Sequence, residues 1–453
     1  MNLLQKILIS VLNPIFGITK NIDIKVRERI SDACLIIIAI QFFVFTSWQK
    51  YGIEYGYSRL FISNTVLLLI VIIFSVKEPL VKVESNKIFC IPWFLCTVLI
   101  IISGLHHNIT PALMFFAGTM LFVFPCLYFV WNNRGDYETL FIKASRAIIA
   151  AMIIFNILQL AIAPLYSNEA YSGIAVNPNS IGIASTAGVI GSLYLIVMRE
   201  KHIWIYVLSA GMGTAFAVLS ASRASVLAIM LVMLSFLVCY LRSCKMRFNG
   251  RIKKSIAIVL ILTAVCIGSV SGYRFILSEI TPAVREFVLD KVAAQAYADD
   301  DTQEDNSALV NKFMNRDGVE SMSSGRIYIW KSYIRNLNLV GHERGDQGLY
   351  IEEMYGNYSA HNTYLEIAYR SGIFAGLAYA FIAVYAAVYA FRFMFGKKMF
   401  DYRLSLIPMA VLAFGVLSNL ERALYPLEKA HIFLFFVALT PMFMKRRYDQ
   451  KQN

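Results

Sequence analysis

Charged residues are scarce in this 453-residue chain, since Asp, Glu, Lys and Arg together make up only 16% of it. Soluble globular domains carry about a quarter charged residues. Hydrophobic residues make up 58%, which excludes an ordinary soluble domain. A helix needs roughly 20 apolar residues to cross a hydrocarbon core about 30 Å thick, and the chain offers many such runs. Because strands of a membrane barrel would alternate in polarity, we predict an all-α integral membrane protein.

Motifs of soluble enzymes are also missing. The chain has no Gly-rich phosphate loop, paired-aspartate metal motif or HExxH, so nucleotide hydrolysis and metal-dependent transfer have no support. Its seven cysteines have no CxxC or metal-like spacing, which predicts small buried residues instead of disulfides or zinc ligands. His106 and His107 have no nearby Cys or carboxylate in sequence. We therefore expect no metal and no cofactor.

Apolar runs predict twelve spans and a division into three parts. A bundle of about nine helices occupies residues 1–270, a long polar loop residues 271–372, and about three helices with a tail residues 373–453. The stretch 203–241 would measure about 58 Å as one helix, so it must fold back, with its turn at 220–223. No cleavage pattern follows the first run, which argues against a cleaved signal peptide. The predicted spans are 31–48, 60–76, 88–105, 111–131, 147–164, 181–198, 203–219, 224–241, 255–270, 373–391, 404–420 and 432–444.

The distribution of Lys and Arg predicts the orientation. The side that holds both termini carries 27 of these residues, and the short loops of the other side carry 5. Long loops are poor reporters of orientation, so the long loop is left out of the comparison. Both termini are predicted to be cytoplasmic, with the long loop, Arg223 and the Glu421-Arg422 pair on the outer face of the inner membrane. This rule also accounts for the net charge of +13 without nucleic acid.

The long loop has its own predicted organisation. An amphipathic stretch at 273–298 leads to an acidic run at 299–305, interpreted as a mobile connector. A second helix follows, for which Ser323 or Ser324 is the expected cap. Its apolar face, expected on the bilayer surface or at the bundle mouth, is formed by residues at helical spacing: Ile327, Trp330, Ile334 and Leu337.

Three side chains are candidates for chemistry. His361 comes just before a helical pattern that starts at Thr363, and an imidazole that titrates near pH 6.5 suits a general base. The alternative is a histidine that caps or packs at a helix start. Arg223 and Arg326 carry guanidinium groups suited to bidentate phosphate binding. Their alternatives are snorkelling to the headgroups for Arg223 and a solvated helix start for Arg326, although a cation there opposes the helix dipole.

Further polar residues are expected on the same face. Asn177-Pro178-Asn179 precedes the sixth span, where an asparagine caps a helix or bonds sugar hydroxyls, and capping is favoured. Glu421 and Arg422 lie between two spans and offer an ion pair with each other as the alternative to a role in a site. A cationic groove for an anionic lipid head, with the alternative that each is a solvated charge, draws on Arg335, His342, Arg344 and Arg370.

These motifs together resemble the pattern of a known superfamily. Ser222-Arg223 opens a span, Ser324-Gly325-Arg326 precedes Trp330, and His361-Asn362-Thr363-Tyr364-Leu365 leads to Gly372-Ile373-Phe374-Ala375-Gly376. With Asn177-Pro178-Asn179, they are similar in order and membrane placement to the bacterial O-antigen polymerase and O-antigen ligase superfamily of polytopic membrane glycosyltransferases. The resemblance covers about residues 170–380.

The resemblance implies glycosyl transfer from an undecaprenyl-pyrophosphate-linked oligosaccharide at the periplasmic face, without nucleotide sugar, cofactor or metal. It implies His361 as the base and Arg223 and Arg326 as diphosphate ligands, all three catalytic. The expected partners are lipid-linked oligosaccharides, membrane lipids and a polysaccharide chain-length regulator, and no nucleic acid. The residues expected to bind substrate are Asn362, Asn179, Arg335, Arg344, Tyr364 and Arg422.

Three functions remain open at this point. A polymerase is favoured because the long loop holds 10 basic against 15 acidic residues, whereas a ligase meets a phosphorylated lipid A core that rewards a more cationic face. An O-antigen ligase is the first alternative. A flippase of lipid-linked sugars is the second, but the two halves of the chain do not resemble each other, as transporter repeats would.

Overall fold

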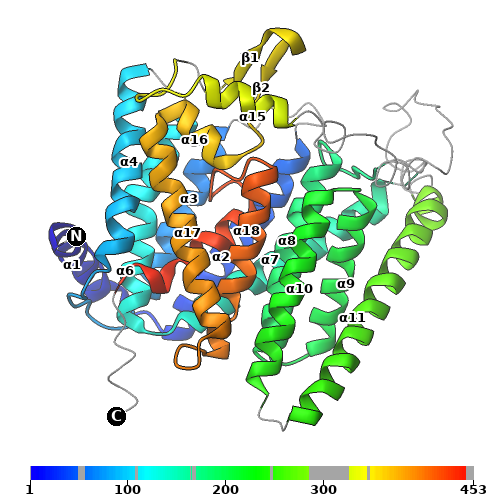
Figure 1. The fold of residues 1–453 in the computed structure, drawn as a ribbon. Helices are drawn as coiled ribbons and strands as arrows, with labels where there is room; N and C mark the ends of the chain where they lie inside the picture. Colours follow the sequence, from blue (N-terminus) through cyan, green and yellow to red (C-terminus); the bar gives the residue numbers. More distant parts are fainter. Residues whose placement is uncertain are drawn as a thin grey trace.

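The computed structural model describes residues 2–48, 57–107, 111–163, 165, 170–244, 248–284, 326–343 and 347–444. This part of the chain is helical apart from one short hairpin and an isolated bridge between Ser85 and Met444. The helices stand side by side, and the short elements that precede α17 cover one end of the bundle (Figure 1). The prediction of an all-α membrane protein is confirmed.

Each of the twelve predicted apolar runs overlaps one or more helices. Within the described residues, nine helices are long and apolar enough to cross a membrane, and the exact number of spans stays a prediction. The helices before the long loop are α1 (Asn2–Thr19), α2 (Ile24–Trp48), α3 (Tyr57–Ser75), α4 (Lys87–His107), α5 (Pro111–Gly118), the π-helix η2 (Thr119–Val123), α6 (Phe124–Arg134), α7 (Tyr137–Ile162), α8 (Pro178–Val197), α9 (Ile203–Leu219), α10 (Arg223–Ser243), α11 (Phe248–Phe275) and the π-helix η3 (Ile276–Ile280). Those after it are α17 (Ile373–Phe395), the 3-10 helix η6 (Tyr402–Leu404), α18 (Leu406–Leu420), α19 (Ala430–Ala438) and the 3-10 helix η7 (Thr440–Met442).

Two helical segments go beyond the sequence prediction. The basic N-terminal tail begins with α1, whose Gln5 and Asn13 side chains bond backbone groups of Val83 and Leu80. The helical span of α11 continues through η3 to Val284, which is 14 residues beyond the predicted end at residue 270. The predicted turn at 220–223 is confirmed, because α9 ends at Leu219 and α10 begins at Arg223.

The long loop folds into a small layer with its own core. Its elements are α15 (Arg326–Arg335), β1 (Leu349–Ile351), the 3-10 helix η5 (Glu352–Met354), β2 (Gly356–Tyr358) and α16 (Thr363–Ser371). The strands are antiparallel, with Tyr350 opposite Asn357. Ile329 and Tyr333 of α15 pack with Ile351, Ala360 and Tyr369. The helix α15 was predicted. The residues that it buries in the loop core, Ile329 and Tyr333, lie next to the predicted apolar face and are not part of it. Ile334 of the predicted face is 58% exposed. The predicted caps Ser323 and Ser324 and the acidic run lie outside the described residues.

The loop layer joins the bundle by a close backbone contact. Gly372 has φ of +93°, and a Cβ there would lie 2.1 Å from the Leu339 carbonyl oxygen. Only glycine fits such a position. The Ile373 N–H donates to the Asn338 carbonyl at 2.9 Å, and the Ser103 hydroxyl of α4 donates to the Arg370 carbonyl at 3.1 Å. The start of α17 is therefore fixed against the segment that follows α15.

A buried ion pair lies beneath this contact. Glu366 and Arg370 are 0% and 2% exposed, and Arg370 Nε donates to Glu366 Oε1 at 3.0 Å. The other carboxylate oxygen accepts the Ala360 N–H at 2.8 Å, and Arg370 Nη1 donates to the Tyr425 hydroxyl at 3.1 Å. The expectation that Arg370 is a solvated cation or a groove residue is therefore wrong, because its guanidinium is buried against a carboxylate.

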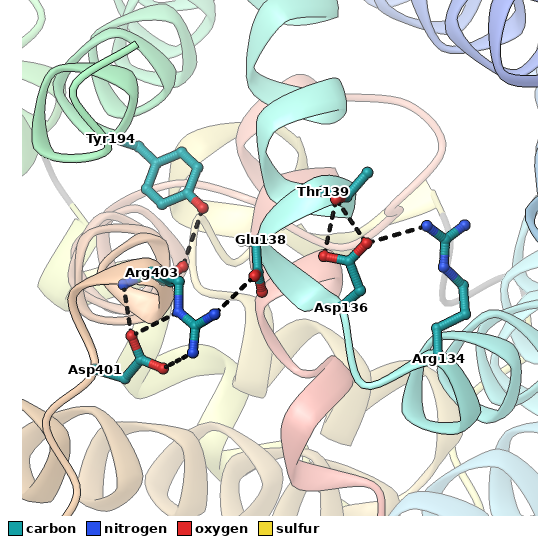
Figure 2. A network of polar contacts seen from close by, with 7 residues as sticks. All are labelled: Arg134, Asp136, Glu138, Thr139, Tyr194, Asp401 and Arg403. Atoms are coloured by element: carbon teal, nitrogen blue, oxygen red, sulfur yellow. Dashed lines mark hydrogen bonds and ion pairs between the residues drawn. The ribbon is translucent and has the colours of Figure 1, made fainter. Parts of the chain in front are cut away.

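A second polar network lies near the opposite end of the bundle (Figure 2). Arg403, the middle residue of η6, pairs with Asp401 and with Glu138 of α7, each at 3.0 Å. The Tyr194 hydroxyl, near the C-terminal end of α8, donates to the Arg403 carbonyl. Arg134 pairs with Asp136 at 3.2 Å, and this carboxylate also accepts the Thr139 hydroxyl. These contacts hold α7, α8 and the segment before α18 together.

The two networks predict different responses to mutation. Glu366→Ala leaves the buried Arg370 charge unpaired, and we expect it to lower the free energy of unfolding by about 3–5 kcal/mol. Arg403→Ala removes contacts of a side chain that is 43% exposed, and we expect a loss of at most about 1 kcal/mol. Denaturant unfolding of the detergent-solubilised variants measures both. Equal losses would contradict the expectation that the buried Glu366–Arg370 pair matters more for stability than the exposed pairs of Arg403.

Candidate active site

One carboxylate gathers the polar residues at the loop-covered end of the bundle. Glu421 follows α18 directly, and its Oε1 accepts from Arg326 Nη2 of α15 at 2.5 Å. Its Oε2 lies 3.3 Å from Nδ1 of His361. The Asn179 amide, from the first turn of α8, donates to Oε1 at 3.4 Å. Three sequence-predicted site residues, Arg326, His361 and Asn179, therefore meet at a fourth residue.

The protonation of this group follows from its surroundings. Burial alone would raise the pKa of Glu421, but the hydrogen bond with His361 and the positive charge of Arg326 outweigh it and hold this pKa below its ordinary value. The carboxylate is therefore ionised at neutral pH and only accepts hydrogen bonds. Nδ1 of His361 must then carry the proton that it donates, which leaves Nε2 as the basic nitrogen of the neutral ring.

The backbone on both sides of His361 is fixed. Its φ of +44° is a left-handed conformation that is uncommon outside glycine and enriched in His. The preceding Ala360 carbonyl accepts the Trp330 indole N–H at 2.7 Å, and the Ala360 N–H donates to Glu366. The Thr363 hydroxyl accepts the Ala423 N–H at 2.9 Å. The ring itself stays accessible, with 39% of the side chain exposed.

Asn362 and Tyr364 take structural positions beside His361. Asn362 is the N-cap of α16, and its Oδ1 accepts the N–H groups of Tyr364 and Leu365, each at 3.1 Å. The Tyr364 ring lies 6.3 Å from the ring of Tyr379 in α17. These contacts fix the start of α16. A role for either residue in substrate binding stays a prediction.

Arg223 lies at the same end, at the first residue of α10. It follows a turn in which Ala221 has φ of +49° and the hydroxyls of Ser222 and Ser225 are 2.8 Å apart. This turn packs on Gly182 of α8, where a Cβ would lie 2.7 Å from the Ser222 Cβ. Because Gly182 is three residues from Asn179 on the same helix, the first turns of α8 connect the Arg223 turn to Glu421.

The other predicted residues are more dispersed. Arg335 is exposed at the end of α15, and Arg422 follows Glu421 directly. His342 stacks on the Tyr369 ring with 4.1 Å between ring centroids. Arg344 lies outside the described residues. The capping interpretation of the Asn177 motif is confirmed, since the Asn177 side chain accepts the Ser180 N–H at 2.9 Å.

Sequence reasoning missed Glu421 as the centre of the site. It placed Glu421 on the outer face and weighed an ion pair with Arg422, its neighbour in the chain, against an unspecified role in a site. The ion pairs of Glu421 with Arg326 and His361 instead join residues that are 95 and 60 positions apart. The available signal was its position, because an acidic residue directly after an apolar span is costly to bury without a partner.

The fold and site together define a polytopic α-helical membrane protein with a histidine–carboxylate–arginine cluster at one end of its bundle. Residues 204–380 match the protein-family model described as O-antigen ligase, which confirms the resemblance to the O-antigen polymerase and ligase superfamily. The matched region contains Arg223, Arg326 and His361 but neither Asn179 nor Glu421. No curated protein matches the chain.

The family match supports a general function that is common to O-antigen polymerases and O-antigen ligases. It indicates a glycosyltransferase-type activity of the O-antigen polymerase or ligase kind, with lipid-linked polysaccharide substrates, in lipopolysaccharide biosynthesis. The nine apolar helices of the described residues and this family fit a multi-pass protein of the inner membrane.

The cap at Asn362 yields a test of its role. Asn362→Ala removes the acceptor for two N–H groups, and we expect it to lower the free energy of unfolding by about 1 kcal/mol. Asn362→Asp keeps an oxygen in the same place and should keep wild-type stability. Unfolding curves of the two detergent-solubilised variants measure the difference. If Asn362→Asp loses as much as Asn362→Ala, capping is not the structural role of this side chain.

Proposed function

We propose that this protein is an O-antigen polymerase, a glycosyltransferase that joins undecaprenyl-pyrophosphate-linked oligosaccharide repeat units at the periplasmic face of the inner membrane. The observation that carries the proposal is the contact of one ionised carboxylate, Glu421, with both His361 and Arg326. Such a cluster combines a base with an oriented tautomer and a cation that suits phosphate.

The proposed reaction is a displacement at the anomeric carbon of the donor sugar. An acceptor sugar hydroxyl attacks this carbon, and Nε2 of His361 takes the hydroxyl proton. The new glycosidic C–O bond forms as the C–O bond to the diphosphate breaks, so undecaprenyl pyrophosphate leaves with both bonding electrons and the configuration inverts. In the polymerase, the donor carries the growing chain and the acceptor is the next repeat unit on its own lipid carrier.

The charges that develop during the reaction suggest the roles of Arg223, Arg326 and Glu421. The diphosphate is already a good leaving group, so the protein chiefly stabilises the negative charge that develops on it. Arg223 and Arg326 supply that stabilisation. Glu421 keeps His361 in the productive tautomer and stabilises the imidazolium that forms after proton transfer, as the carboxylate does in a serine-protease triad. One carboxylate against two arginines leaves the site net positive, as a diphosphate requires.

The choice of polymerase over ligase rests on charge. The long loop carries more acidic than basic residues, 15 against 10, and a phosphorylated lipid A core would be repelled by such a surface. An O-antigen ligase that transfers finished polysaccharide to this core is the second candidate, and the description of the matching family favours it. The proposed periplasmic placement rests on the excess of Lys and Arg in the short loops of the opposite side.

The lipopolysaccharide ladder of cells lacking the gene tests the function. For a polymerase we expect core capped with a single repeat unit. Complementation with His361→Asn should fail, because loss of a general base costs about 10²–10⁴-fold in rate. Asparagine tolerates the left-handed backbone of position 361.

A matched control is His202→Asn, since His202 is also left-handed, with φ of +60°, but follows the end of α8 that is remote from Glu421. This variant should restore the full ladder. Uncapped core with polymer retained on the lipid carrier would identify a ligase instead. A full ladder from His361→Asn at normal abundance would exclude His361 as the base.

The carboxylate makes a separate prediction about the transfer rate. Glu421→Gln replaces the carboxylate by a neutral amide that no longer stabilises the imidazolium formed on proton transfer, so the maximal transfer rate should fall by at least about tenfold. Glu138→Gln, which removes a carboxylate paired with Arg403 near the opposite end, serves as the control and should keep the wild-type rate. A wild-type rate for Glu421→Gln at normal abundance would refute the coupling of Glu421 to His361.

A further inference from the structure

An apolar groove of about 460 Å³ lies between α10 and α11, with the end of α9 at its base. Its volume falls within the range of about 300–1,000 Å³ typical of small-ligand sites. No charged residue lines it, and its few polar lining groups are Thr214, Thr263 and Cys266. Residues that line it, such as Met230 and Ile267, are more than half exposed, so the groove opens sideways from the bundle.

Helix packing explains the groove. Gly211 of α9 lets α11 approach closely, because a Cβ there would lie 2.8 Å from Val265 Cγ1. The helix α11 thus packs along α9, and no side chain of its apolar window is buried in the described structure. The two helices come together at their lower ends and spread apart toward the upper end, where α10 begins (Figure 1). The space between α10 and α11 is therefore bounded by side chains of both helices and not filled by them.

The groove begins near Arg223, one of the candidate site residues. Its lining on α10 runs from Val226 to Leu237, about 16 Å along the helix axis. Val226 is one helical turn from Arg223, the first residue of the same helix. A ligand whose anionic group binds Arg223 would therefore place an attached apolar chain at the mouth of the groove.

We propose that this groove binds the polyprenyl chain of the lipid-linked donor, with the diphosphate at Arg223. The assignment rests on the proposed function, which supplies the diphosphate. One end of the groove lies a helical turn from the Arg223 cation on α10, while its walls are apolar. This order matches a molecule with one anionic head and one long hydrocarbon chain. Bound in this way, the chain stays within the hydrocarbon layer while the anomeric carbon is held at the site.

Site-specific photo-crosslinking tests the groove directly. A benzophenone-bearing amino acid is placed at Leu234, which lines the groove, or at Val384 of α17 as the control. The two side chains are 57% and 59% exposed, and each lies the same number of residues beyond the first residue of its helix. The full-length protein is irradiated in nanodiscs of phosphatidylethanolamine and phosphatidylglycerol that contain undecaprenyl pyrophosphate, and the adducts are identified by mass.

The expected result is an undecaprenyl pyrophosphate adduct at position 234 in at least about tenfold excess over position 384. Arg223→Ala should reduce this excess, because the head group loses its ligand. Phospholipid adducts alone at position 234, or equal yields at the two positions, would overturn the proposal. This readout does not depend on transfer activity, so a protein that crosslinks but never polymerises refutes the proposed function and not the groove.

A second variant pair links the groove to turnover. Thr263→Trp fills the groove from α11, whereas Leu260→Trp adds the same bulk one turn away at a position that does not line it. Thr263→Trp should raise KM for an undecaprenyl-linked donor by about tenfold or more and leave KM unchanged for a donor with a short, water-soluble prenyl chain. Leu260→Trp should change neither. Equal effects of Thr263→Trp on both donors would also overturn the proposal.

Discussion

The cluster at the end of this bundle depends on a single carboxylate. Without the charge of Glu421, Arg326 and the Asn179 amide lose a shared acceptor, and the His361 ring loses the group that fixes its tautomer. The segment after α18 thereby joins α8, α15 and the segment that precedes α16. A buried carboxylate is tolerated only where such partners compensate its desolvation. The partners and the carboxylate therefore require each other.

Other anchors in the loop layer serve the same geometry. Trp330 and Glu366 hold the two backbone groups of Ala360, one from each side, and Asn362 caps the helix that follows. The imidazole between these anchors is positioned by its backbone, while its ring stays accessible. Rigid support around a reactive side chain is what precise catalysis requires. The loop residues around His361 are thus best understood as one supporting structure built on the Glu366–Arg370 pair.

Sequence alone predicted the features that depend on local pattern. The apolar runs located the helices, and the length of 203–241 required the turn before Arg223. Arg326 and His361 were selected as candidates from their type and place, and both contact Glu421. Features that depend on tertiary packing were not predictable. The role of Glu421 arises from residues as many as 242 positions away, and the burial of Arg370 follows from how α16 rests on α4 and Tyr425. The helix α1 was hidden because its basic surroundings are typical of a cytoplasmic tail.

The position of Glu421 near the end of the chain has a consequence for biosynthesis. Asn179, Arg326 and His361 emerge from the ribosome before Glu421, and their common acceptor is added only when α18 has been made. A nascent or truncated chain that stops before residue 421 contains the histidine and the arginines but lacks the group that aligns them. The cluster therefore matures only when most of the protein has been inserted into the bilayer. Under the proposed function, a partly synthesised copy therefore lacks the aligned group that transfer requires.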